Sequence, residues 1–200
     1  MPQHLTLVQM NDSHAYFEPH PELFWSGNRL VYRTAGGYAR VASALNAIRA
    51  ERPGAVLAFD GGDTFHAAVH TQGEVLIPVL DALRFDAMTA HWDFAYGPAR
   101  LRELATRLPY PVLAANCYDE ATGDRPFPAW RICEAGGVRV GVIGLAAVIV
   151  DRIMPPTFNQ GIRLTLGNDE LPELIGTLRG QEQVDLVVVL SRLGFPQDMK

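Results

Sequence analysis

The sequence predicts an α/β domain, and two observations support this fold class. Short runs of apolar and β-branched residues, typical of buried strands, alternate with segments in which apolar residues recur every three or four positions, as in helices. Polar or acidic residues follow directly after several of these strands, at the edge where open α/β sheets bind ligands. We therefore expect the chain of 200 residues to form one domain.

The individual elements follow from the same periodicity. Pro98 favours the start of a helix, Pro78 is expected to bend the helix that contains it, and Asn168 or Asp169 is expected to cap a third helix. Ala135-Gly136-Gly137 indicates a hairpin turn. The expected strands are residues 5–10, 55–59, 86–89, 112–115, 130–134, 138–145 and 184–190, and the expected helices are residues 37–52, 74–83, 98–108 and 168–179.

Charge and composition argue against several classes of function. A net charge of −5 is unfavourable for binding nucleic-acid polymers. The longest apolar stretch, residues 140–150, contains glycines and is too short to cross a bilayer, so no membrane association is expected. No signal peptide is visible, which predicts a cytoplasmic protein as the sequence stands, or a periplasmic one if a leader was removed. Cys117 and Cys133 fit neither a zinc knuckle nor a disulfide framework and are expected to be buried free thiols.

Four groups of polar residues follow predicted strands and suggest a metal site. Carboxylates and imidazoles ligate metals when rigid elements hold them in a fixed geometry. Strand alternation is expected to turn both side chains of an Asp-x-His pair the same way. Each group alone is also explained by helix capping or core packing, but their joint appearance in this order favours a metal site. The groups are Asp12-Ser13-His14, Asp60-Gly61-Gly62-Asp63, His91-Trp92-Asp93 and Ser191-Arg192-Leu193-Gly194.

These segments, in this order, resemble the 5′-nucleotidase group of the calcineurin-like metallophosphoesterases. The resemblance implies a four-layer α/β/β/α sandwich that is incomplete at its C-terminus, with residues 1–200 as an N-terminal domain that lacks the last strands and the substrate domain. The segments that carry it, between about Leu5 and Asp198, are Asn11-Asp12-Ser13-His14, Gly36-Gly37-Tyr38-Ala39-Arg40, Asp60-Gly61-Gly62-Asp63-Thr64, Ala115-Asn116, Val138–Leu145 and Val188–Gly194.

The resemblance implies a ligand set and a cofactor. Asp12, His14 and Asp63 would hold a divalent ion, with His91 at a neighbouring position that shares Asp63. Manganese is the first expectation, zinc or iron are the alternatives, and one or two ions fit the pattern. Such an ion activates water and polarises a phosphoryl or sulfonyl oxygen. We assign His91, Asp93 and Arg192 to the catalytic group, and Asn116, His66 and Arg192 to substrate binding.

The segment around His91 narrows the resemblance. The nucleotidases have Gly-Asn-His-Glu-Phe-Asp-Tyr-Gly there, so His91 replaces a metal-binding Asn and Trp92 replaces a catalytic His. Trp92 cannot handle the protons of phosphoester cleavage, although it can still pack against the wall of the site. His-Trp-acidic-Phe instead resembles the thiosulfohydrolases of the bacterial sulfur-oxidising (Sox) system. The implied substrate is therefore a small phosphoester or a sulfonated cysteine of a carrier protein.

Arg192 departs from the family pattern, which has a metal-binding His at this position. Arginine is permanently protonated and offers no lone pair to a metal. One hypothesis is a single-metal site in which the guanidinium replaces the second cation and holds an oxyanion. The other is a catalytically degenerate relative that acts as a binding or scaffold module.

Residues outside these motifs give weaker expectations. The aromatic-rich segment 16–33 is expected to be a lid, an insertion or a plain hydrophobic flap near the site. His70 lies four residues after His66 and is expected either to line the cleft with it or only to share one face of a turn. His4 and His20 are expected to be surface residues.

Overall fold

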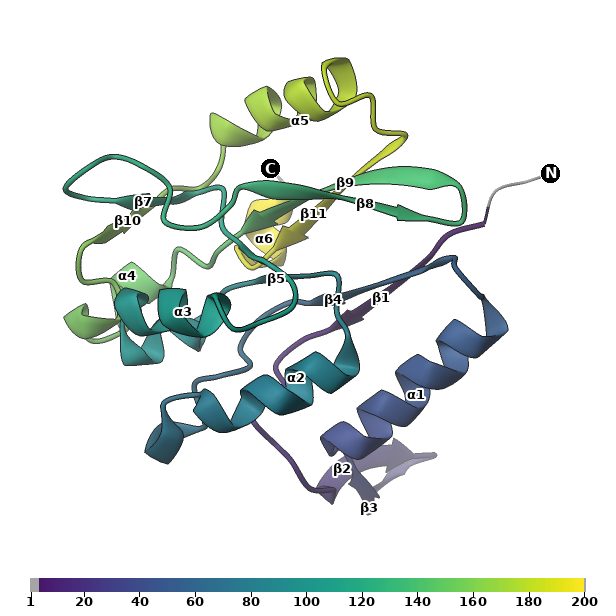
Figure 1. Cartoon of the computed structure of the whole chain (residues 1–200). Coiled ribbons are helices and arrows are strands. Elements are labelled where there is room, and N and C mark those ends of the chain that lie inside the picture. Colours follow the sequence, from purple (N-terminus) through teal and green to yellow (C-terminus); the bar gives the residue numbers. More distant parts are fainter. Residues whose placement is uncertain (1–3, 200) are drawn as a thin grey trace.

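The computed structural model describes residues 4–199, and the sheets and helices within them form four layers (Figure 1). The first sheet has the order β1-β4-β5-β6, and its neighbouring strands are parallel. The second has the order β11-β9-β8, with β11 parallel and β8 antiparallel to β9. The bounds are β1 Thr6–Met10, β4 Val56–Asp60, β5 Ala87–Thr89 and β6 Val112–Leu113, then β8 Trp130–Ala135, β9 Val138–Leu145 and β11 Leu186–Ser191.

The two sheets pack face to face through an apolar core. Phe59 and Leu113 of the first sheet lie in one buried cluster with Val140, Val142 and Leu190 of the second. The outer face of the first sheet is covered by α1 (Tyr38–Glu51), α2 (Ile77–Leu83) and α3 (Pro98–Ala105), and the outer face of the second by α5 (Glu170–Gly180) (Figure 1). The expected α/β/β/α sandwich is thus confirmed.

Several boundaries differ from the expectation for local physical reasons. Residues 74–83 do not form one bent helix, because a 3₁₀ turn over Glu74–Leu76 precedes α2 and Pro78 lies in the first turn of α2. Proline is tolerated there because the first N–H groups of a helix have no intrahelical partner. Asp169 is the N-cap residue of α5, but its side chain makes no capping hydrogen bond. Both α3 and β6 end earlier than expected.

The segment expected as a lid or flap contains a β-hairpin. β2 (His20–Ser26) pairs antiparallel with β3 (Arg29–Ala35), and the hairpin lies beside α1, outside both sheets (Figure 1). The aromatic side chains of Trp25 and Tyr32 are exposed, so alternation between a buried and a solvated face does not mark these strands.

Short elements complete the described chain. They are β7 (Cys117–Asp119), β10 (Ile162–Leu164), α4 (Val150–Ile153), α6 (Phe195–Asp198) and the 3₁₀ turns η1 (Val69–Thr71), η3 (Trp92–Tyr96) and η4 (Pro156–Phe158). Cys117 and Cys133 are buried free thiols, as expected. Among residues 4–199, no helix has the length and apolar character needed to cross a membrane.

Candidate metal centre

The site begins where β1 and β4 end side by side. Met10 is paired with Asp60 in the parallel register, so the loops that follow leave the same edge of the sheet. Backbone hydrogen bonds join the two loops: the N–H of Asp12 donates to the carbonyl of Gly62 at 3.0 Å, and the N–H of His14 donates to the carbonyl of Asp63 at 3.0 Å. This arrangement brings side chains 51 positions apart into one cluster.

A left-handed backbone, and not strand alternation, orients these side chains. Asp12, His14, Ala15 and Asp63 have φ values of 54°, 50°, 54° and 63°, which side-chain-bearing residues rarely adopt. The Asp-x-His pair has therefore already left the strand, and our explanation from alternation is wrong. Such backbone strain persists where surrounding structure holds it, and it concentrates at functional sites.

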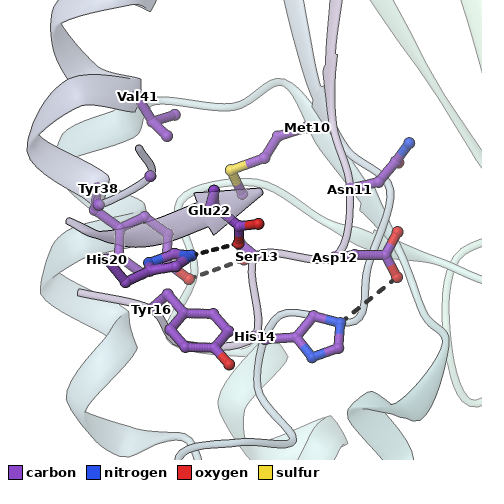
Figure 2. Close-up of a pocket in the computed structure, with 12 residues that line it drawn as sticks. Met10, Asn11, Asp12, Ser13, His14, Tyr16, His20, Glu22, Tyr38 and Val41 are labelled. Atoms are coloured by element: carbon purple, nitrogen blue, oxygen red, sulfur yellow. Dashed lines mark hydrogen bonds and ion pairs between the residues drawn. The ribbon is translucent and has the colours of Figure 1, made fainter. Parts of the chain in front are cut away.

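Asp63 lies at the centre of the cluster and is 4% exposed. Its Oδ2 is 3.6 Å from His14 Nε2 and 3.0 Å from His91 Nδ1. The imidazole of His14 also faces Asp12, with 3.7 Å between Nε2 and Oδ1 (Figure 2). The structure thus brings together the four side chains that the sequence predicts as metal ligands, while their ligation itself stays a prediction.

His66 is closer to Asp63 than any of the expected ligands. Its Nδ1 lies 2.5 Å from Asp63 Oδ1, yet these two buried atoms do not form a hydrogen bond with each other or with any other group of residues 4–199. Ligand atoms of His14, Asp63 and His66 all lie within 4.8 Å of one another. Buried polar atoms without a protein partner are rare and favour an ion or a water as the partner, so this donor set fits a divalent cation.

Arg192 reaches the same cluster from the end of β11. Its Nη2 and Nη1 donate to Asp12 Oδ1 and Oδ2 at 2.8 and 3.1 Å, and Nη2 is 3.7 Å from Asp63 Oδ2. The hydrogen bond from Arg192 lowers the pKa of Asp12 to about 2. A guanidinium therefore engages both oxygens of one expected metal ligand, although sequence reasoning assigned Arg192 to substrate.

Asp93 organises the backbone around Asp63. Its Oδ2 accepts from the N–H groups of Asp63 and His91, and its Oδ1 accepts from those of Thr64 and Phe65, at 2.8–3.0 Å. The side chain is fully buried. These bonds commit the carboxyl group to the Asp63 loop and favour a positioning role for Asp93, while its assignment to the catalytic group stays a prediction.

A second buried carboxyl lies below the site. Asp60 is inaccessible to solvent and accepts hydrogen bonds from the Gly62 N–H and the Thr64 hydroxyl. Burial, and next the charge of Asp93, raises the pKa of Asp60 to about 7. The sequence signalled Asp60 only as part of a loop motif, because its burial depends on how the loop that follows β4 folds around it.

The remaining candidates have structural partners or lie apart. The amide of Asn116 donates to the carbonyls of Ala146 and Thr165, and its oxygen accepts from the N–H of Ala146, so its predicted substrate contact stays a prediction. His70 is exposed on η1, outside the cluster described above. Trp92 stacks on His91 with a ring separation of 5.7 Å and contacts His66 edge-on, which agrees with a packing role in the site wall.

A cavity of about 400 Å³ adjoins the cluster through Asp12 and His14 (Figure 2). Its far side is formed by Tyr16 and by His20 and Glu22 of the hairpin, whose side chains are 2.8 Å apart. His20 is therefore half-buried and engaged rather than a plain surface residue. Sequence reasoning missed this wall because it forms only when the hairpin packs near the end of β1.

Comparisons with known proteins find relatives among the 5′-nucleotidases. The chain is 26% identical over 201 residues to a 5′-nucleotidase of Vibrio cholerae, and 29% identical over 203 residues to a probable 5′-nucleotidase of Treponema pallidum. Among solved structures, a 5′-nucleotidase precursor of Thermus thermophilus is 28% identical, has a TM-score of 0.78, and matches 97% of this chain and 38% of its own. These comparisons support a relationship of the chain to the 5′-nucleotidase-type metallophosphoesterase superfamily.

Further comparisons show a shared fold with another hydrolase and the share of each relative that the chain covers. The sulfate thiohydrolase SoxB of Thermus thermophilus shares the superfamily fold, with a TM-score of 0.82 and 24% identity over 97% of this chain and 45% of its own. No family model matches the chain. The two curated relatives match 97% of this chain. The chain spans about a third of their length, 34% of the Vibrio protein and 33% of the Treponema protein.

Proposed function

We propose that the chain forms the metal-binding part of a metal-dependent hydrolase that acts on phosphoester or sulfonate-type substrates. The observation that carries the proposal is the convergence of His14, His66 and His91 on the buried carboxylate of Asp63 at the edge of the first sheet. When bound, a divalent ion supplies Lewis acidity, activating water and withdrawing charge from a phosphoryl or sulfonyl oxygen. Manganese is the metal we propose first, as the sequence resemblance implies.

The residues around Asp63 contribute positioning and charge. Asp93 fixes the Asp63 loop through its four accepted N–H bonds, and His91 orients the Asp63 carboxylate through Oδ2. Arg192 adds a fixed positive charge beside the cluster, where it can hold an oxyanion of the substrate if it releases Asp12. The cavity beside Asp12 offers space for the part of a substrate that does not react.

The substrate choice rests on the motif at His91. His91 and Trp92 stand where nucleotidases have Asn and His, and Trp92 packs against both His66 and His91. Because Trp92 cannot donate a proton to a leaving group, this position favours a substrate whose leaving group departs without a general acid. A sulfonated cysteine of a carrier protein meets that condition, because a sulfur leaving group is a weaker base than an alkoxide. A small phosphoester is the second substrate class.

A catalytically degenerate scaffold is the rival function, and the Arg192–Asp12 pair favours it. A bidentate guanidinium neutralises a carboxylate that would otherwise bind metal, and the pair lowers the pKa of Asp12 to about 2 through that hydrogen bond. A cation must then compete with Arg192 for Asp12.

Metal analysis followed by turnover separates the two functions. The intact protein, purified with manganese and desalted, is expected to retain about one equivalent by elemental analysis. It is then expected to hydrolyse a chromogenic phosphate ester or a thiosulfonate, and Asp63→Asn should abolish this activity. Asp151→Asn, at an exposed carboxyl on α4, is the matched control and should leave it unchanged. Metal binding without turnover of either substrate would support the scaffold instead.

A further inference from the structure

We propose that His66 is itself a metal ligand, and that His14, Asp63 and His66 form a mononuclear site. This set differs from the one implied by the motif resemblance, which contains Asp12 and His91 and leaves His66 to bind substrate. The inference rests on the proposed metal centre, but it concerns the binding of the ion and not turnover.

The contact between His66 and Asp63 carries the inference. Their Nδ1 and Oδ1 atoms lie 2.5 Å apart without the geometry of a hydrogen bond, and both atoms are buried. The two side chains are only 18% and 5% exposed, so solvent has little access to satisfy these atoms. These atoms form an ion pair if the imidazole is protonated, but when Nδ1 is unprotonated the nitrogen and the carboxylate oxygen are a donor pair that a cation can share.

The distances suit a first-row divalent ion after a small adjustment. Ligand nitrogen and oxygen atoms bind zinc at about 2.0–2.2 Å, so two ligands in a tetrahedral shell lie about 3.4 Å apart. The 3.6 Å between His14 Nε2 and Asp63 Oδ2 already matches this spacing. The His66 contact must open by about 1 Å, and this residue lies on a turn outside helices and strands, between β4 and η1.

The competing ligands are engaged elsewhere. Both oxygens of Asp12 accept from Arg192. The Nδ1 of His91 forms a hydrogen bond with Asp63 Oδ2, and its ring stacks on Trp92. His91 therefore has the geometry of a residue that orients a ligating carboxylate, a role that supports the ligands of many metal sites.

Metal affinity tests the assignment without any enzymatic assay. We expect His66→Gln to weaken Mn²⁺ and Zn²⁺ binding, measured by calorimetry, by at least about 100-fold, since loss of even a residue that only orients a ligand weakens binding about 10–100-fold. His70→Gln is the matched control, because it removes an exposed imidazole four positions away, and it should bind like the unaltered protein. Thermal unfolding in the presence of a chelator checks that each variant is folded.

A second variant gives a positive signal. In His66→Cys loaded with Co²⁺, a thiolate-to-cobalt charge-transfer band should appear that the unaltered protein, with Cys117 and Cys133 both buried, does not show. Unchanged affinity in a folded His66→Gln together with no such band in folded His66→Cys would overturn the inference and leave the metal centre in place. If the unaltered protein binds neither Mn²⁺, Zn²⁺ nor Co²⁺, this inference and the proposed hydrolase both fail.

Discussion

Replacing Asp93 by asparagine should strongly destabilise the fold, because this one side chain satisfies four backbone N–H groups. Asparagine has the same shape but only one acceptor oxygen, so two of the four groups must face an amide nitrogen that cannot accept. Each buried donor left without a partner costs about 1–3 kcal/mol. We therefore expect Asp93→Asn to lower the free energy of unfolding by about 4 kcal/mol, a large part of a typical total of about 5–15 kcal/mol.

Urea unfolding followed by circular dichroism, with a chelator present so that metal binding does not contribute, measures this change. Asp151→Asn is the control, and a substitution at such an exposed position should alter the unfolding free energy by less than about 0.5 kcal/mol. A loss below about 1 kcal/mol for Asp93→Asn would show that the Asp63 loop does not depend on this carboxyl. The positioning role that we assign to Asp93 would then be refuted.

Three further predictions concern the neighbouring residues. Asp60 has a pKa of about 7 in the fold, raised by burial and next by the charge of Asp93. The stabilisation from protonated Asp60 is therefore fully present below about pH 4 and is lost as the pH rises through about 7, a decrease of about 4 kcal/mol in the free energy of unfolding. Urea unfolding at several pH values should show this decrease in the unaltered protein but not in Asp60→Asn. Gly62→Ala should destabilise by about 3 kcal/mol in the same assay, because Gly62 has a φ of +87° and its added Cβ would meet the Thr89 carbonyl. Arg192→His should free Asp12, offer a new imidazole and raise the manganese retained, counted by elemental analysis; an unchanged count would contradict competition between Arg192 and the metal.

The fold was largely predictable because its strands carry strong local signals. Residues 55–59 and 138–145 are apolar on both faces, as strands covered by two layers must be, and they appear within one residue of the expected bounds. The two strands of the β2–β3 hairpin were not predictable, because their aromatic side chains are exposed and no alternation between a buried and an exposed face marks them. The strand expected over residues 112–115 is shorter, because only Val112 and Leu113 pair with β5.

The sequence predicted which residues gather at the candidate site but not how their side chains are directed, and the roles of these residues stay predictions. Residues that follow parallel strands must meet at one edge, which placed Asp12, His14, Asp63 and His91 together. The direction of each side chain depends on loop conformation and hydrogen bonds that no spacing encodes. In the structure, the Asp93 carboxyl accepts from four backbone N–H groups, and His66 lies at the centre of the cluster, neither of which the sequence indicated.

The hydrogen bonds around Asp63 indicate which part of the site decides whether the chain is active. Asp63 is fixed by the Asp93 bonds, by the backbone bond from His14, and by the close packing of Gly62 against its neighbours. Its position is therefore set by the fold and does not need a ligand to form. The side chain of Asp12, in contrast, is about half exposed and is held mainly by the guanidinium of Arg192. We therefore propose that the Arg192–Asp12 pair, rather than the position of Asp63, decides whether the chain is active.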